Sequence, residues 1–298
     1  MQRWLIVGSG DIARRMASLV RGPVQLFALC RDRDCAARWR ELGAIPLTGN
    51  LDHPATLRRL SGLAEVVFHF APPPTHTPDD PRTGNLIAAL ERGGSLPQHL
   101  IYISTTGVYG DCQGALIDET RPVCPVTPRA RRRTDAERRL RAFGARSGCL
   151  VSIVRAPGIY AEDRLPLKRL QQGGPIPASA EDPWTNHIHA LDLARAALQA
   201  ARRGRPNRIY NAVDDNRLRL GDYYERLAHH FGLPMPERLP MTTLQQRISE
   251  IHWSFMTESR QIANTRIKSE LHLSWYYPTI DDLLRTIPTR NIGDLKLE

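Results

Sequence analysis

The sequence lacks the features that would place the chain in a membrane or outside the cell. Its 298 residues include no apolar run of membrane-spanning length. Gly8 and Gly10 interrupt the apolar stretch near the N-terminus, which therefore does not resemble a secretory signal peptide. The five cysteines are scattered and odd in number, and none forms a Cys-x-x-Cys pair. We therefore expect a cytoplasmic protein with reduced thiols, without disulfides and without a metal site.

The sequence also has no internal repeat and no low-complexity linker. With 298 residues and 41% hydrophobic residues, it can form one large α/β domain or a domain with a smaller lobe. The net charge of +10 comes mostly from arginine. A basic surface can attract nucleic acid or phosphorylated substrates. Because charge alone is not a binding motif, we favour arginines on solvated faces as its explanation.

What the sequence does contain is a strand–turn–helix opening typical of dinucleotide-binding units. The apolar residues 4–7 run directly into GSGDIA at residues 8–13, and a helical pattern follows. Gly8 permits the tight turn, Gly10 lets a pyrophosphate approach the backbone, and Ala13 lets the helix pack on the strand. The free N–H groups at the start of the helix would then face the anion. An ordinary strand–turn–helix corner is the alternative, so the motif is judged together with the rest of the chain.

Apolar runs alternate with helical patterns along most of the chain. Strands are expected at residues 4–7, 24–29, 66–70, 100–104, 150–154 and 208–211, and helices at residues 11–20, 35–42, 54–60, 83–91, 130–145 and 190–201. This order predicts βαβ units and a doubly wound parallel sheet that is buried on both faces. We assign residues 1–155 and 188–213 to a dinucleotide-binding core. Residues 156–187 and 214–298 are assigned to a smaller lobe at the carboxyl edge of the sheet, where α/β proteins bind ligands.

A series of motifs resembles the extended short-chain dehydrogenases/reductases of the NAD-dependent epimerase/dehydratase type. GSGDIA, HFAPPP, YISTTGVYGD, RAPGIYA, NHIHALDLARA and IYNAVDD follow in the family's order, and residues 260–273 resemble its C-terminal lobe. The resemblance implies a Rossmann core, bound NAD or NADP, and hydride transfer with a small polar or nucleotide-sugar substrate. The residues expected at the cofactor are Gly8, Gly10, Asp11, Ile12, Arg31, Arg33, Asn50, Leu51, Phe70, Ala71, Pro72, Ser104, Arg133 and Pro157.

The family's acid–base pair is missing from its expected position. The resemblance implies a Ser/Thr that orients the substrate oxygen, a Tyr that exchanges a proton with it, and a Lys that lowers the Tyr pKa and holds the cofactor ribose. Thr105 matches the first position, but Pro128 and Glu137 set a frame that places Arg129 at the Tyr and Arg133 at the Lys. Arginine cannot transfer a proton near neutral pH. The guanidinium of Arg133 could still hold a ribose hydroxyl or a phosphate.

Two interpretations remain open. In the first, the chain is an enzyme whose proton carrier lies elsewhere, with Tyr109, Tyr160, His187 and His189 as candidates; Tyr109 joins Thr105 and Arg133 in the expected catalytic set. Tyr109 also occupies a position where the family keeps a structural tyrosine. In the second, the chain binds the dinucleotide without turning it over, as a sensor or scaffold. Atypical members of the family that keep the glycines and lack the Tyr resemble this case.

The residues after the second strand favour NADP over NAD. Arg31 stands first after the strand and Arg33 is near, and a guanidinium fork matches a 2′-phosphate. Asp32 argues for NAD, because an acid there can bind the ribose hydroxyls. Asn50 falls where the family keeps an acid beside the adenine, and it could either bond the adenine or simply form a turn. The prolines at residues 72–74 supply no N–H donors and either stiffen a loop wall or end the strand.

Seven arginines crowd the helix expected over residues 130–145 and the residue before it: Arg129, Arg131, Arg132, Arg133, Arg138, Arg139 and Arg141. The resemblance implies that this helix can contribute to a two-fold dimer interface, so a homodimer is one option. A phosphate site and a nucleic-acid surface are others, but the aromatic residues that would interleave with the arginines of a nucleic-acid surface are absent. We expect a largely solvated face and a small-molecule substrate.

Overall fold

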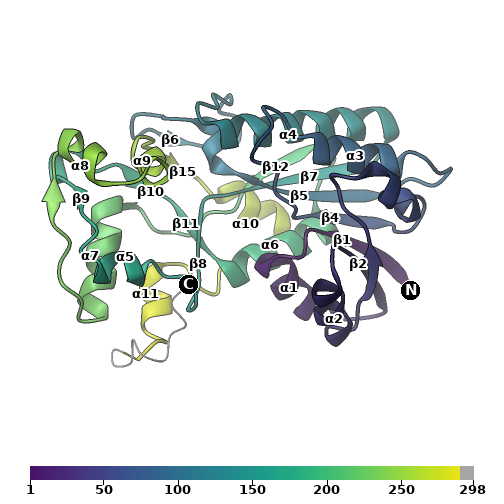
Figure 1. The fold of residues 1–298 in the computed structure, drawn as a ribbon, viewed down its shortest axis with the longest axis horizontal. Coiled ribbons are helices and arrows are strands. Elements are labelled where there is room, and N and C mark those ends of the chain that lie inside the picture. Colours follow the sequence, from purple (N-terminus) through teal and green to yellow (C-terminus); the bar gives the residue numbers. More distant parts are fainter. Residues whose placement is uncertain (289–298) are drawn as a thin grey trace.

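The computed structural model describes residues 1–288 and is built around one parallel sheet (Figure 1). Its strands are β1 (Gln2–Val7), β2 (Val24–Cys30), β3 (Ile45–Thr48), β4 (Val66–His69), β5 (His99–Thr105), β7 (Leu150–Ala156) and β12 (Arg208–Asn211). They lie in the order β12-β7-β5-β4-β1-β2-β3, and every neighbouring pair is parallel. The strand order reverses at β1, which has β2 on one side and β4 on the other. The predicted doubly wound sheet is therefore confirmed.

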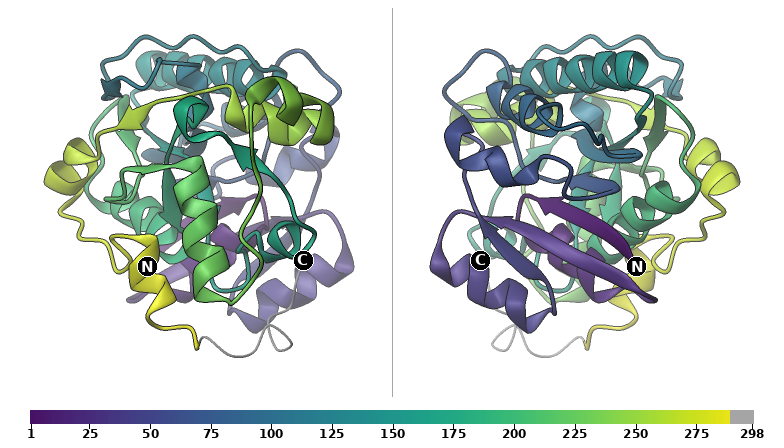
Figure 2. Two further views of the ribbon diagram at one scale, coloured as in Figure 1. Left: turned by 90° about the vertical axis from the view of Figure 1, so that its left-hand side faces the viewer. Right: turned by 90° about the vertical axis from the view of Figure 1, so that its right-hand side faces the viewer.

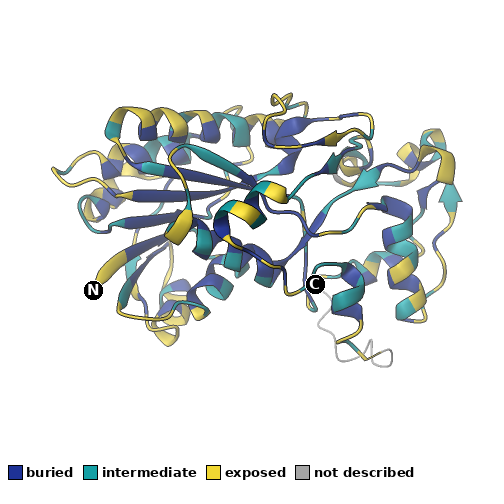
Figure 3. Ribbon diagram, turned by 180° about the vertical axis from the view of Figure 1, so that it is seen from behind, coloured by how far each residue is buried: buried dark blue, intermediate teal, exposed yellow. Residues whose placement is uncertain are grey.

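Helices cover both faces of this sheet because its strands send apolar side chains alternately to each face. In β1, Trp4 and Ile6 join one buried cluster while Leu5 and Val7 join the other. The first cluster is covered by α1 (Asp11–Ser18), α2 (Arg33–Glu41), α6 (Ala190–Arg203) and α10 (Thr265–Leu271). The second is covered by η1 (Pro54–Leu60), α3 (Pro81–Leu90) and α4 (Pro128–Ser147). Figures 2 and 3 show the resulting three layers, with the strands buried between the helices.

A smaller lobe lies beyond the carboxyl ends of the strands, at the left of Figure 1. Its helices are α5 (Leu167–Gln171), η3 (Ser179–Glu181), α7 (Leu220–His230), α8 (Met241–Arg247), α9 (Glu250–Met256) and α11 (Ile280–Leu284). Short strands pair beside them, namely β8 (Gly158–Tyr160) with β11 (His187–His189), β9 (Ile176–Pro177) with β14 (Arg238–Leu239), β10 (Trp184–Thr185) with β13 (Leu218–Arg219), and β6 (Leu116–Ile117) with β15 (Gln261–Ile262). The lobe has its own apolar core, which includes Tyr160, Tyr223, Leu227 and Leu283.

Two elements differ from the expected pattern. The expected strands omit β3, whose four residues are not fully buried and include Pro46, so that its apolar pattern is weak. Helix α10 was expected in the smaller lobe, but Ile267 and Leu271 pack into the core cluster against α6 and β12. The apolar side of α10 thus covers the β12 edge of the sheet, and a boundary after residue 213 does not separate this helix from the core.

The arginine-rich helix α4 docks through an apolar stripe that includes Leu140 and Phe143. Thr127 caps its start by accepting a hydrogen bond from the N–H of Ala130. Its arginines are only partly solvated, since the buried Arg132 donates to the Thr77 carbonyl and Arg139 pairs with two carboxylates. Among residues 1–288, no helix combines the length and apolar character that a membrane crossing requires.

Candidate dinucleotide and substrate site

The first cavity of the site lies over the switch in strand order, at the carboxyl ends of β1 to β4. It encloses about 380 Å³. Eight of the expected cofactor residues line it: Gly8, Gly10, Arg31, Asn50, Leu51, Phe70, Ala71 and Pro72. The sequence motifs around the glycines and after β4 therefore meet at one place, which is the location that open α/β sheets use for nucleotides.

Gly8 and Gly10 are glycines for different reasons. Gly8 has φ +101°, and a Cβ added there would lie 2.3 Å from the backbone nitrogen of Ala71. Gly10 has an ordinary extended backbone, with φ −75° and ψ −176°, and a Cβ added there would meet no atom within 4 Å. The fold itself therefore requires Gly8, whereas Gly10 leaves open space beside the start of α1. A diphosphate fits such a cradle, because the N–H groups of that helix end favour an anion.

The first cavity is also rich in positive charge that the chain does not neutralise. The guanidinium groups of Arg14, Arg31 and Arg38 line it and have no hydrogen-bonding or ionic partner in the described part of the chain. By contrast, Arg82 donates to both oxygens of Asp52, at 2.8 and 2.7 Å, and these hydrogen bonds lower the pKa of that carboxyl. Arg14 and Arg38 were not expected here from the sequence, although Arg14 follows Gly10 at the helical spacing of four residues.

Asp32 has a structural role as the N-terminal cap of α2. Its Oδ1 accepts a hydrogen bond of 2.7 Å from the Cys35 N–H and so caps α2. Arg33, by contrast, is the exposed first residue of α2 and does not line the cavity. Arg31 is therefore the one expected arginine that the structure brings to the first cavity.

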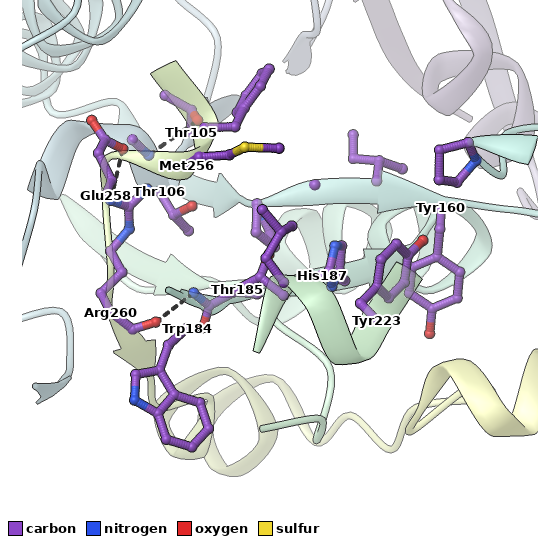
Figure 4. Close-up of a pocket in the computed structure, with 18 of the residues that line it drawn as sticks. Thr105, Thr106, Tyr160, Trp184, Thr185, His187, Tyr223, Met256, Glu258 and Arg260 are labelled. Carbon is purple, nitrogen blue, oxygen red and sulfur yellow. Dashed lines mark hydrogen bonds and ion pairs between the residues drawn. The ribbon is translucent and has the colours of Figure 1, made fainter. Parts of the chain in front are cut away.

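The second cavity lies between the sheet and the smaller lobe and encloses about 440 Å³. Thr105 and Pro157 line it where β5 and β7 end, and Arg129 lines it from the first turn of α4. Figure 4 shows Thr105, Glu258 and Arg260 toward one end, and His187, Tyr223 and Tyr160 toward the other. The walls between them are largely aromatic and apolar, with Trp184, Tyr224, Phe255, Met256 and Leu220. The cavity thus has one charged end and one aromatic end.

Thr105 is positioned to donate a hydrogen bond into this cavity. Its Oγ1 accepts a hydrogen bond of 3.2 Å from the Gly107 N–H and caps η2 (Thr106–Tyr109). Because this contact uses only a lone pair, the hydroxyl proton stays available for a substrate oxygen.

His187 and His189 lie in environments that suit structural roles. His187 stacks on Tyr223 with the ring centres 4.1 Å apart, and its burial lowers the pKa to about 4. It is therefore neutral near pH 7. His189 accepts a hydrogen bond from the Leu191 N–H through Nδ1 and caps α6, outside both cavities. Tyr160 lines the aromatic end, where burial, and then the nearby Asp214, raise the pKa of its phenol.

Tyr109 and Arg133 line neither cavity. The Tyr109 hydroxyl is buried and donates to Oδ1 of Asn211 at 2.9 Å. The Arg133 guanidinium donates to the Tyr102 hydroxyl at 2.9 Å and to the Ile103 carbonyl at 2.8 Å. Arg133 thereby joins α4 to β5. The catalytic role of Tyr109 and the contact of Arg133 with a ribose stay predictions that this arrangement does not favour.

Three other expected cofactor residues also lie beside the cavities. Asp11 pairs with Arg15 at 2.9 Å and with Arg164 at 3.3 Å, while Ile12 packs against the core. Ser104 is buried, and its Oγ has no hydrogen-bond partner among the residues that the structure describes. Since Arg164 lines the second cavity, its pair with Asp11 links the start of α1 to that cavity.

A nucleotide crevice over β1, with a second cavity at the end of β5, defines the class of dinucleotide-binding α/β proteins. The particular family follows from comparison with known proteins. The chain belongs to the NAD dependent epimerase/dehydratase family, whose model matches residues 8–212. The site is therefore that of an NAD(P)-dependent, epimerase/dehydratase-like protein with a nicotinamide cofactor.

Individual relatives are more distant. The chain is 26% identical over 259 residues to a 4-hydroxy-2-methyl-3-oxo-4-farnesyl-3,4-dihydroquinoline-1-oxide ketoreductase of Stigmatella aurantiaca, covering 78% of this chain and 74% of that protein. A functionally unknown conserved protein from Silicibacter pomeroyi has a TM-score of 0.78 and 26% identity, with 96% of this chain and 98% of that chain covered. A human epimerase family protein with NADPH has a TM-score of 0.74 at 17% identity, with 96% and 98% covered, and is similar in fold.

Proposed function

We propose that the chain is an NADP-dependent oxidoreductase that reduces a carbonyl group or oxidises the corresponding alcohol at Thr105. The observation that carries this proposal is the pair of cavities at one sheet edge, with the glycine cradle in the first and the Thr105 hydroxyl in the second. The similarity to a ketoreductase over most of both chains supports carbonyl chemistry rather than another reaction of the family.

The unpaired arginines of the first cavity support NADP as the cofactor. Arg31 and Arg38 lie near the carboxyl end of β2, where the 2′ position of an adenosine ribose is expected. Two free guanidinium groups there match a 2′-phosphate, whereas Asp32 already caps α2 through one of its oxygens. We therefore favour NADP over NAD.

When bound, the nicotinamide supplies or accepts a hydride. The chain's own residues then position the substrate. The Thr105 hydroxyl donates a hydrogen bond to the substrate oxygen, and the aromatic wall around Tyr223 and Trp184 packs against the rest of the substrate. Because Arg129 stays charged, the proton that completes the alcohol comes through Thr105 from solvent and not from Arg129.

Turnover with a panel of ketones tests this proposal. NADPH absorbance should fall in the presence of a substrate, and Thr105→Val should lower kcat by about 100- to 1000-fold, as expected for the loss of a donor to the reacting oxygen. Thr105→Ser keeps both the hydroxyl and the cap of η2 and should retain most of the activity. Equal activity of the Val and wild-type proteins would show that Thr105 is not the donor.

A second candidate function is a dinucleotide-binding regulator without turnover. It is supported by Arg129, which lines the second cavity and which the resemblance matches to the family's proton-transferring Tyr. A regulator should bind NADPH with the same affinity in the wild-type and Thr105→Val proteins, and no ketone, aldehyde or sugar nucleotide should change the nicotinamide absorbance.

A further inference from the structure

Arg129 is a charged group that makes no ion pair of its own among residues 1–288, although the charge of Glu258, which pairs with Arg260, acts on it. It is the second residue of α4 and lines the second cavity together with Thr105. Its guanidinium carbon lies 4.6 Å from the ring centre of Phe255, a residue that is itself 47% exposed. No hydrogen bond or ion pair joins Arg129 to another residue within the described range 1–288. This cation–π contact holds the guanidinium beside the ring and leaves its N–H donors free.

The other arginines of this cavity are already neutralised. Arg260 pairs with Glu258 at 2.8 Å and donates to the Gly110 carbonyl at 2.6 Å. Arg164 pairs with Asp11 at 3.3 Å. Because each of these cations faces a carboxylate, the charge of Arg129 is the one that the lining of the cavity leaves unbalanced. The charged end of the cavity therefore carries a net positive potential.

The charges at the start of α4 are unfavourable for the stability of the helix. Its first turn contains no acidic residue, and Arg129, Arg131, Arg132 and Arg133 place four positive charges at the end of the helix that is already positive. Such an arrangement is unfavourable for the helix, because the macrodipole favours acids there. An anion bound at Arg129 would relieve this repulsion, whereas a neutral sugar or ketone would not.

The remaining walls indicate what carries the anion. Phe255, Trp184, Tyr223 and Tyr224 offer flat apolar surfaces around the cavity. A bidentate guanidinium matches the two oxygens of a carboxylate. We propose that the second cavity binds a substrate with a flat apolar body and a carboxylate next to the reacting carbonyl, and that Arg129 holds the carboxylate. This inference rests on the proposed function for the reacting carbonyl, but the binding of the acid can be measured separately.

An acid and its uncharged ester test whether Arg129 recognises the negative charge of a carboxylate. Binding of 2-oxo-3-phenylpropanoate and of its methyl ester is measured by calorimetry on the full chain, with NADP⁺ present so that no turnover occurs. The acid should bind more tightly than the ester. Arg129→Gln should weaken binding of the acid by about tenfold to 100-fold, as expected for lost hydrogen bonds to a charged group, and leave the ester unchanged. Arg131→Gln is the control, because Arg131 is exposed and lines neither cavity.

The possible results separate this inference from the proposed function. Equal binding of acid and ester, or equal loss in both arginine variants, would overturn the inference. Binding of UDP-glucose that depends on Arg129, without binding of the oxo acid, would also overturn it and assign the site to a phosphate. Selective binding of the acid without any NADPH turnover would support the inference while contradicting the proposed function. The Arg129→Gln protein should unfold at a temperature no lower than the wild type, since Arg129 has no hydrogen bond or ion pair within residues 1–288 to lose and its charge opposes the start of α4.

Discussion

Replacing Gly10 by alanine separates cofactor binding from folding. Gly10 has a backbone conformation that any residue adopts, and a Cβ there would meet no atom within 4 Å. As the residue that caps α1, alanine is worse than glycine by less than about 1 kcal/mol. The reduced freedom of the unfolded chain offsets this by about 0.4–1 kcal/mol. The free energy of unfolding should therefore stay within about 1 kcal/mol of the wild-type value.

The same methyl group should weaken cofactor binding, because it would occupy the space where a diphosphate approaches the start of α1. We expect the Kd for NADPH to rise at least about tenfold, which corresponds to about 1.4 kcal/mol. Fluorescence titration gives the Kd and urea denaturation gives the stability. An alanine variant that binds NADPH as tightly as the wild type would refute the placement of the diphosphate at Gly10.

Gly8→Ala is the matched comparison. At φ +101° and 2.3 Å from the Ala71 nitrogen, its Cβ would strain the backbone and push against the end of β4. Backbone strain and overpacking each cost about 1–3 kcal/mol, so the variant should lose about 2–6 kcal/mol of stability before any ligand is added. A stable Gly8→Ala protein would contradict the close approach of the first turn to β4.

The remaining predictions concern cofactor choice and pH. The double variant Arg31→Ser, Arg38→Ser should have a Kd for NADPH that is about tenfold higher or more, and an unchanged Kd for NADH, in paired titrations. Arg33→Ser should change neither Kd. Tighter binding of NADH than of NADPH by the wild type would contradict the preference for NADP. Burial raises the pKa of Asp214 from 3.8 to about 8, so the folded state keeps a proton that the unfolded chain releases. Its contribution to stability is full below about pH 4 and is lost as the pH rises toward about 8, by up to about 1.4 kcal/mol per pH unit. Asp214→Asn should therefore gain stability relative to the wild type between about pH 6 and pH 8 in thermal unfolding, and parallel pH profiles of the two proteins would contradict the raised pKa.

The sheet could be predicted because its code is local. The run of apolar residues in β1 and the glycines after it lie within a dozen residues. Apolar runs of the same kind recur at β2, β4, β5 and β7. Parallel strands bring their carboxyl ends to one edge, so Gly8, Phe70 and Thr105 could be assigned to that edge of the sheet without knowing the packing. For this reason, residues expected at the cofactor after β1 and β4 line the first cavity.

Residues that reach the site from helices and from the lobe could not be predicted in the same way. Arg38 lines the first cavity because of how α2 is turned, and Phe255 and Glu258 line the second cavity because of how the lobe folds. The lobe's helices and strand pairs are too short for periodicity to fix which face they turn inward. Arg133 shows the converse case, a residue that was expected at the cofactor and lines neither cavity. Its spacing of four residues from Arg129 places both on one face of α4, but its long side chain bonds to Tyr102 and the Ile103 carbonyl.

The net charge of +10 takes on a more specific meaning once the contacts are known. Exposed arginines such as Arg58 and Arg202 fit the expected solvated faces. Others are neutralised by carboxylates, as in the buried pair of Arg155 with Glu137 at 2.6 Å. The unpaired arginines at the carboxyl edge of the sheet are different, because they line the two cavities that the fold opens there. These unpaired arginines stabilise the folded chain only when an anion binds to them, so they favour ligand binding and not folding. We propose that Arg129, which the resemblance matches to the family's Tyr, gives the site a group that holds a negative charge in place of one that moves a proton.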